Sequence, residues 1–258
     1  MNWIQRQFLA LYEEDLPREA VLADRVYRHV HTFKYDFFAG TGLYEISDDN
    51  PAIHPGVPRR IVVKIYRRRR FFGLPCGWFG KLSVLHEARL YRLLGGIEGI
   101  PRFEGFVGKT GFAHEFVPGN KLHRKDFVND LFFDRFERML KEVHARHVAY
   151  VDLNKPENVL LGEDRKPYLI DFQISYAPRR WFPPFRTVTG WILAQFQRED
   201  WYHFIKHKRR MRKDLLTQAD YDNYFFQSLP VRLHRKLARP YFQIRHRIME
   251  RLGLKSVE

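Results

Sequence analysis

The first half of the chain carries the hydrophobic pattern of β-strands. Runs of alternating or continuous apolar residues predict strands at 26–35, 37–46, 59–66, 105–107 and 111–117. A turn-rich loop at 47–58 separates the second run from the third, and Pro118 ends the last one. One helix is expected among these strands, at residues 84–94, with Ser83 as its N-cap.

Helical spacing dominates the second half. Apolar residues recur every three to four positions over 131–147, which predicts an amphipathic helix. Two short apolar strands are expected next, at 159–161 and 168–170, and further helices from Thr189 onward. The pattern therefore changes from mainly strand to mainly helix near the middle of the chain, which is typical of an α+β fold.

Composition identifies a folded chain with a strong positive charge. Of the 258 residues, 45% are hydrophobic and 16% aromatic, unlike the composition of disordered proteins. The single cysteine, Cys76, excludes an internal disulfide and a zinc site built from cysteines. With no secretory or membrane-spanning pattern in the sequence, we expect a cytoplasmic protein. The formal net charge of +15 favours anionic partners without choosing among them.

Two charged residues lie where the pattern is apolar. Lys64 sits inside the strand at 59–66, and Glu87 falls on the apolar stripe of the helix at 84–94. An isolated buried charge is costly, so we predict that the two side chains pair with each other. The alternative is that each extends separately to solvent.

A third group of polar residues surrounds the predicted hairpin. If its turn is centred between residues 164 and 165, Asn158 lies opposite Asp171, close enough for both to bind one hard cation. Asp152 lies just before the hairpin and converges on the same loop. The alternative for each residue alone is a local side-chain turn.

These residues, in this order, resemble the protein-kinase-like superfamily over about residues 33–175. The strand Ile61-Val62-Val63-Lys64 is similar to the kinase lysine strand, and Lys155-Pro156-Glu157-Asn158 to the catalytic loop. Leu169-Ile170-Asp171-Phe172-Gln173 resembles the Asp-Phe-Gly segment. The resemblance implies an α+β, two-lobed fold: an antiparallel-sheet lobe with one helix at 1–117, and a reduced, mainly helical lobe at 118–258.

The resemblance also implies roles for single residues. Lys64 would hold the ATP phosphates and pair with Glu87, and Asp152 would accept the proton of the attacking hydroxyl. The two Mg²⁺ ligands would be Asn158 and Asp171. The residues expected to cover or bind the nucleotide are Gly40, Thr41 and Gly42 in the glycine loop and Glu115, Phe116 and Val117 in the hinge between lobes.

Several features depart from the family pattern. Asp152 precedes Asn158 by six positions instead of five, so Asn154 could share the role of the base. Tyr150-Val151 replaces the usual His-Arg, which makes switching by activation-loop phosphorylation unexpected. The third glycine of the glycine loop is missing, and no Ala-Pro-Glu follows Asp171, which disfavours a polypeptide substrate.

Among the relatives, the pattern is most similar to compact bacterial lipopolysaccharide core kinases, which phosphorylate heptose or Kdo sugars. Asp152-Leu153-Asn154 resembles their catalytic loop. A membrane-proximal glycolipid sugar or another small hydroxyl compound is therefore the expected acceptor. A protein serine/threonine kinase is the alternative within the enzyme class, and a nucleotide-binding pseudokinase is the alternative outside it.

Basic residues mixed with aromatic residues form candidate contacts for an anionic membrane surface at 66–72, 78–81 and 179–186. We expect the protein to lie at the inner face of the cytoplasmic membrane through them. The alternative is a solvated arginine cluster beside buried phenylalanines. Nucleic acid is the less favoured partner of the same residues. The basic run at 206–213 is expected to be an exposed helix face.

Overall fold

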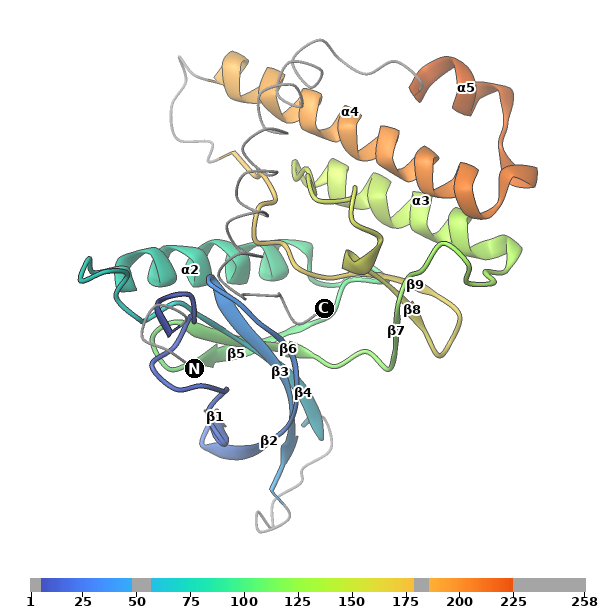
Figure 1. The fold of residues 1–258 in the computed structure, drawn as a ribbon. Helices are drawn as coiled ribbons and strands as arrows, with labels where there is room; N and C mark the ends of the chain where they lie inside the picture. The colour runs from blue at the N-terminus through green and yellow to red at the C-terminus, as the bar shows by residue number, and fades with distance from the viewer. Residues whose placement is uncertain (1–5, 48–56, 179–185, 225–258) are drawn as a thin grey trace. The chain divides into compact units, whose positions relative to one another are not determined.

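The computed structural model describes residues 6–47, 57–178 and 186–224 (Figure 1). Residues of the chain group into two compact units. Of the described residues, the first unit holds the chain up to Arg89 together with Arg102–Phe116, and the second holds Leu90–Pro101 and the chain from Val117 to Tyr224. The expected division of the chain at residue 117 stays a prediction. The loop expected at 179–186 lies almost entirely outside the described residues.

The first unit is built on one antiparallel sheet. Its six strands run in the order β1-β2-β3-β4-β6-β5. Their bounds are Glu19–Leu22 for β1, Arg25–Tyr35 for β2, Ala39–Ile46 for β3, Arg60–Tyr66 for β4, Phe103–Val107 for β5 and Gly111–Glu115 for β6. The helix α2, Gly77–Leu94, follows β4. The α+β class and the antiparallel first sheet with one helix are thereby confirmed.

The two faces of this sheet differ in polarity. Val63 and Ile65 of β4 lie on an apolar face, where a core cluster also includes Leu16 of the preceding segment. Lys64 lies on the opposite face. The N-terminal segment therefore supplies the hydrophobic cover for one face and leaves the face of Lys64 free to carry polar groups.

The glycines expected in a phosphate-covering loop lie inside β3. Gly40 and Gly42 are paired with residues of both neighbouring strands, β2 and β4. A Cβ atom on Gly40 would stand 2.7 Å from Leu16, and one on Gly42 would stand 2.6 Å from it. Both glycines therefore lie within the strand predicted at 37–46, where their missing side chains make room for the apolar cover of the sheet. Their role in covering a nucleotide stays a prediction.

The turn between β2 and β3 is instead formed without glycine. Asp36 accepts hydrogen bonds from the backbone N–H groups of Phe38 at 2.8 Å and Ala39 at 3.0 Å. This is the local side-chain turn that aspartate commonly makes. Two phenylalanines, Phe37 and Phe38, therefore stand at the tip of this hairpin.

The helix α2 begins earlier than the sequence indicated. Its first residue is Gly77, and the N–H groups of Phe79 and Gly80 bond to the carbonyl of Cys76. Ser83 is consequently an interior residue and not the N-cap. A Cβ on Gly80 would lie 2.3 Å from the carbonyl oxygen of Arg67, so a glycine lets the helix start against the end of β4.

The second unit is mainly helical. Its helices are α3 (Asp130–Ala145), α4 (Arg186–Met211) and α5 (Gln218–Tyr224), with short 3₁₀ turns at Pro156–Asn158 and Lys213–Leu215. A small antiparallel sheet is formed by β7 (Gly119–Lys121), β8 (Val159–Gly162) and β9 (Pro167–Leu169). Phe136 of α3 packs edge-on against Phe204 of α4, with ring centroids 5.2 Å apart. In Figure 1 these two helices run side by side.

The register of the β8–β9 hairpin differs by one position from the expected register. Val159 pairs with Leu169, and the N–H of Ile170 donates to the carbonyl of Asn158 at 3.1 Å. The cause is a three-residue turn that ends on Arg165 in the left-handed region, with φ 62°. Asn158 therefore lies opposite Ile170, and Asp171 follows one residue later.

None of the described helices is long and apolar enough to span a lipid bilayer.

Candidate active site

The first unit contains a buried ion pair. The Lys64 Nζ lies 2.9 Å from one Glu87 carboxylate oxygen and 3.2 Å from the other. The side chains are 8% and 0% exposed, respectively, and the Tyr66 hydroxyl also donates to the carboxylate. The predicted pairing of strand and helix is thereby confirmed. The contacts among Lys64, Glu87 and Tyr66 offset the cost of burying the two charges.

Thr41 is the member of the expected glycine loop that shares the face of Lys64. It lies directly opposite Lys64 across the β3–β4 ladder, and Lys34 lies opposite Thr41 on the next strand. Directly opposed residues of an antiparallel pair project to the same face of the sheet. One lysine, one hydroxyl and a second lysine therefore form a row across this face.

The second unit holds the loop that follows α3. The Asp152 carboxylate accepts hydrogen bonds from the Lys155 ammonium at 2.7 Å and from the Asn158 amide nitrogen at 3.0 Å. That contact uses the nitrogen of the Asn158 amide and leaves its oxygen for another partner. The structure thus brings Asp152 and Asn158 together, and it adds a lysine to them.

The backbone of this loop is held in an unfavourable conformation. Val151 has φ 71°, which is rare for a β-branched residue and costs about 1–3 kcal/mol. The N–H of Asp152 donates to the carbonyl of Tyr150, which tightens the turn further. Such strain persists only where surrounding contacts fix the chain.

Asp200 of α4 supplies those contacts, and the sequence pattern did not single it out. Its fully buried carboxylate accepts the N–H of Tyr150 at 2.7 Å and that of Val151 at 2.8 Å. His144 of α3 lies 3.0 Å from the same carboxylate. Burial raises the pKa of Asp200, and these hydrogen bonds oppose the increase. No local pattern marks this residue, because Asp200 follows another acid, Glu199, in a helix of mixed polarity.

Two further residues of α4 reach the same loop. His207 is paired with the carbonyl of Leu153 at 2.7 Å, and Lys206 donates to the Asn154 side chain at 2.7 Å. Lys208 forms a buried ion pair with Asp220 at 3.0 Å. The expectation that the run from residue 206 is a plain exposed face is therefore wrong. The cause is that the helix packs against a polar loop.

Asp171 lies at the start of the segment after β9. Its φ of 62° falls in the left-handed region, which aspartate tolerates better than most residues. Its N–H donates to the Tyr91 hydroxyl at 3.3 Å, and its carboxylate accepts the N–H of Gln173 at 3.4 Å. The neighbouring Phe172 is buried and packs edge-on against Tyr91 and Tyr150, at 5.0 and 5.3 Å.

These rings connect the backbone before Asp152 with Asp171. Tyr91, Phe172 and Tyr150 form a continuous aromatic column, and the N–H of Tyr150 ends on Asp200. The Tyr150 hydroxyl also donates to the carbonyl of Ile170, next to Asp171. Tyr150 thus takes part in both ring packing and hydrogen bonding.

The oxygen atoms at Asn158 and Asp171 fit a hard divalent cation. Magnesium is commonly held by one or two protein carboxylates while water and substrate phosphates complete its coordination. Across the part of the chain that the structure describes, no three His, Cys, Asp or Glu residues form a metal-binding group. A carboxylate and an amide oxygen are therefore a donor set for a metal shared with a nucleotide, which stays a prediction.

The expected adenine-binding residues lie at the end of β6. The Glu115 N–H donates to the carbonyl of Arg102 at 2.8 Å, and the His114 ring is paired with the Glu115 carbonyl at 2.8 Å. Both backbone groups of Glu115 are thus engaged within the first unit. The adenine contacts of Glu115 and Val117 stay predictions.

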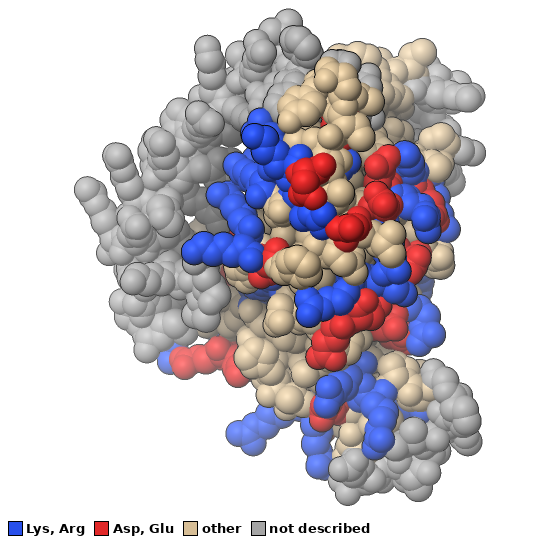
Figure 2. Space-filling model, turned by 90° about the vertical axis from the view of Figure 1, so that its right-hand side faces the viewer, with Lys and Arg blue, Asp and Glu red and all other residues tan. Residues whose placement is uncertain are grey.

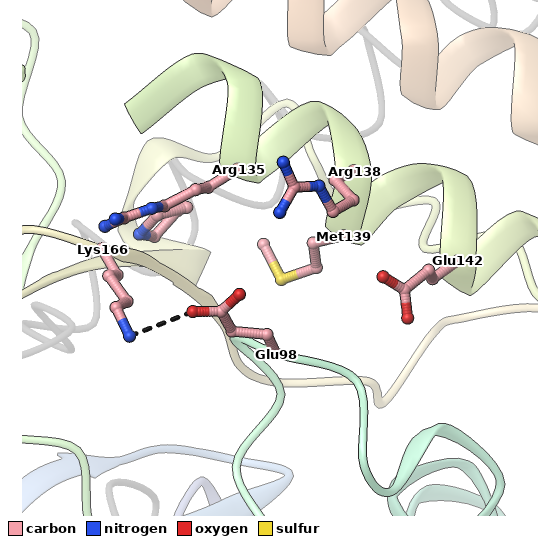
Figure 3. Close-up of a pocket in the computed structure, with 7 residues that line it drawn as sticks. Glu98, Arg135, Arg138, Met139, Glu142 and Lys166 are labelled. Carbon is pink, nitrogen blue, oxygen red and sulfur yellow. Dashed lines mark ion pairs between the residues drawn. The ribbon is translucent and has the colours of Figure 1, made fainter. Parts of the chain in front are cut away.

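A small pocket in the second unit is unsuited to a nucleotide (Figure 3). Its space of about 10 Å³ admits roughly one water molecule. Lys166 forms an ion pair with Glu98 at 3.0 Å across it. Gly99 lies nearby, and a Cβ there would meet Met139 at 2.6 Å, so the region is tightly packed. The pocket is therefore too small and too tightly packed to hold a nucleotide.

No protein-family model matches the chain. A segment is similar to a probable casein kinase I homolog of Encephalitozoon cuniculi, with 28% identity over 107 residues. The match covers 37% of this chain and 33% of that protein, so it spans about a third of the relative's length. Together with the α+β fold, this similarity supports a protein-kinase-like relationship.

Proposed function

We propose that the protein is an ATP-dependent phosphotransferase that acts on a hydroxyl group. The observation that carries the proposal is the loop around Asp152. A carboxylate is held there on strained backbone, in contact with a lysine and with an amide whose oxygen is free for a cation. Strained backbone at a polar loop is typical of active sites.

The reaction needs a base and charge neutralisation. The Asp152 carboxylate accepts the proton of the acceptor hydroxyl as its oxygen attacks the γ-phosphorus, and the bond from that phosphorus to ADP breaks. Lys155, beside Asp152, offsets negative charge on the transferred group. Lys64 binds the nucleotide phosphates, with Glu87 fixing its position.

Mg²⁺, when bound, would neutralise the phosphate charge. The side chains proposed to hold it are Asp171 and Asn158. Asn158 is already oriented for this by its hydrogen bond to Asp152. The residue's nitrogen faces Asp152, so its oxygen is the atom available to the ion.

We propose a membrane-proximal glycolipid sugar, or another small hydroxyl compound, as the acceptor. The support is the Asp152-Leu153-Asn154 sequence, which resembles that of lipopolysaccharide core kinases. The Lys206 ammonium of α4 donates a hydrogen bond to the Asn154 side chain, which fixes the position of that side chain in the loop. A protein serine/threonine kinase is the second candidate, favoured by the similarity to a casein kinase I homolog.

A nucleotide-binding pseudokinase is the candidate outside the enzymes. Two observations favour it: the pairing of Lys155 with Asp152, and the use of Gly40 and Gly42 for packing inside a strand. In this case ATP would bind without phosphate transfer. Turnover measurements separate this candidate from the two kinase candidates.

The test is transfer of label from γ-labelled ATP in the presence of Mg²⁺ to separated lipid, protein and small-molecule fractions. Asp152→Asn and Asp171→Asn should each lower transfer by at least about a hundredfold, which is the typical loss of rate when a general base or a positioned charge is removed. The matched control is Glu163→Gln, an exposed acid in the β8–β9 turn, which should transfer like the wild type. Unchanged transfer by both aspartate variants would overturn the proposal.

The labelled fraction decides the acceptor. Label in glycolipid supports the leading candidate, and label in polypeptides supports the protein-kinase candidate. Nucleotide binding without any transfer would leave the pseudokinase.

A further inference from the structure

The first unit has a basic surface segment without acidic residues. Residues 67–86 contain Arg67, Arg68, Arg69, Arg70 and Lys81 and no Asp or Glu. On the face of the molecule in Figure 2, by contrast, Lys and Arg side chains are interspersed with Asp and Glu. All the formal charges within the segment at 67–86 are therefore positive.

The same segment exposes large apolar side chains. On α2, Trp78 is 63%, Leu82 58% and Leu85 56% exposed. Their spacing of four and three residues places them on one face of the helix. In the turn before α2, Phe72 is 51% and Leu74 67% exposed. We call these five residues the α2 patch.

The opposite face of α2 is already buried. Val84, Glu87 and Ala88 lie inside the first unit, at 2% exposure or less. Packing within this unit therefore does not require the α2 patch to be apolar. A contiguous group of exposed apolar side chains on a folded chain usually marks a binding surface.

The turn that displays Phe72 and Leu74 is firmly held. The backbones of Phe71 and Leu74 bond to each other in both directions, at 3.0 and 2.9 Å. Phe72 has φ 46° and Gly73 has φ 84°, which is an unfavourable conformation for phenylalanine. The Phe72 side chain is thus kept exposed by a backbone conformation that is unfavourable for this residue.

The arginines of this segment divide into two groups. Arg67 is 1% exposed, and Arg69 bonds to the carbonyls of Leu11 and Tyr12, so these two serve the fold. The side chains of Arg68 and Arg70 are exposed, as is that of Lys81 on α2. Three cations are therefore presented to solvent beside the α2 patch.

We propose that the α2 patch docks on an anionic lipid bilayer. The combination of tryptophan, phenylalanine and leucine with lysine and arginine, and no acid, is typical of surfaces that enter the lipid headgroup region. Apolar side chains enter the interface while the cations contact anionic headgroups. This proposal does not depend on phosphate transfer.

The first test is co-sedimentation with vesicles of phosphatidylcholine, with and without phosphatidylglycerol. The test variant is Trp78→Gln/Leu82→Gln/Leu85→Gln, because glutamine retains the helix propensity of α2. The control is Val21→Thr/Val30→Thr, which changes two apolar residues of the same unit at 57% and 51% exposure. Circular dichroism and thermal unfolding establish that both variants are folded.

We expect the wild type and the control to bind anionic vesicles, and the test variant to bind at least about tenfold more weakly. Each of Arg68→Gln, Arg70→Gln and Lys81→Gln should weaken binding about fivefold at low salt. Brominated lipid should quench tryptophan emission of the wild type more strongly than that of Trp78→Gln.

Equal binding by the test variant and the control would overturn the proposal, as would equal binding to neutral and anionic vesicles. A wild-type dimer that becomes monomeric in the test variant would assign the patch to a second copy of the chain and also overturn it. Asp171→Asn should bind vesicles like the wild type, so failure of the proposed phosphotransfer and failure of docking are distinguishable.

Discussion

At the scale of single residues, the contacts of Lys64 explain why a charge is tolerated inside a strand. Glu87 and Tyr66 surround the charge, and neither carboxylate oxygen of Glu87 is left alone. A buried pair of this kind contributes little net stability compared with apolar residues, although the loss of one partner is costly. The net stability that the pair contributes does not by itself explain its presence, which agrees with the proposed binding of nucleotide phosphates by Lys64.

Lys64→Met should lower the free energy of unfolding by about 3–5 kcal/mol, because Glu87 would remain buried without its cation. Lys64→Met/Glu87→Leu should recover most of that loss and still fail to bind ATP with normal affinity. Urea unfolding and nucleotide titration measure the two effects. The control Glu45→Gln breaks an exposed pair with Arg60 and should cost less than about 1 kcal/mol. Normal ATP affinity in the double variant would contradict the role of Lys64.

A second residue-scale prediction concerns pH. Burial lowers the pKa of His207 below its usual 6.5, so the folded chain keeps this ring neutral while the unfolded chain binds a proton. The corresponding stability is complete above about pH 6.5 and is lost as the pH falls towards the lower pKa of the folded state. His207→Gln should flatten this part of the stability curve between pH 7 and 5, as measured by urea unfolding. An equally steep curve in the variant would refute the assignment.

At the scale of elements, α4 supports the loop that contains Asp152. Gln197, Asp200 and His207 lie three and seven positions apart and so occupy one side of the helix. Gln197 donates to the carbonyls of His144 and Val148 at the end of α3. One helix face thus positions both ends of the segment that leads into Asp152.

Asp200→Ala should destabilise the chain by about 3 kcal/mol, because the N–H groups of Tyr150 and Val151 lose their acceptor. Hydrogen exchange should accelerate at these two amides more than elsewhere. Asp134→Asn, an exposed acid on α3, serves as the control and should change stability by less than about 0.5 kcal/mol. Unchanged exchange at residues 150 and 151 would show that the loop is held by other contacts.

At the scale of the whole molecule, Arg67 ties distant parts of the first unit together. Its guanidinium donates to the carbonyls of Gln7, Leu9, Phe37 and Arg70 at 2.8–3.3 Å. It also lies 4.0 Å from the centre of the Phe37 ring. A planar group with several fixed donors suits this site, and a lysine would not replace it.

Arg67→Lys should therefore lower the free energy of unfolding by at least about 2 kcal/mol, since most of the carbonyls would lose their partner. Limited proteolysis should cut the N-terminal segment of the variant sooner than that of the wild type. Arg70→Gln, which changes an exposed neighbour, should leave both properties close to the wild type. Equal proteolysis of Arg67→Lys and the wild type would contradict this role.

Local patterns in the sequence predict those elements whose formation depends on nearby residues. Periodicity identified five of the six strands of the first sheet, β1 being the exception, together with the amphipathic helix α3 and the hairpin β8–β9, because each depends on local spacing. The pairing of Lys64 with Glu87 was also predictable, since each charge lay on a face that the pattern marked as buried.

The tertiary structure alone decided the remainder. The register of β8–β9 depends on the backbone conformation of Arg165, and the role of Gly40 and Gly42 depends on Leu16, which covers them from another segment. Asp200 lies 50 residues from Tyr150, and Arg67 lies 60 residues from Gln7, so the spacing of residues in the local sequence cannot predict these contacts. The sequence determined which residues must be buried or paired. Chain folding over long separations determined their partners, because burial requires a partner without specifying where along the chain it lies.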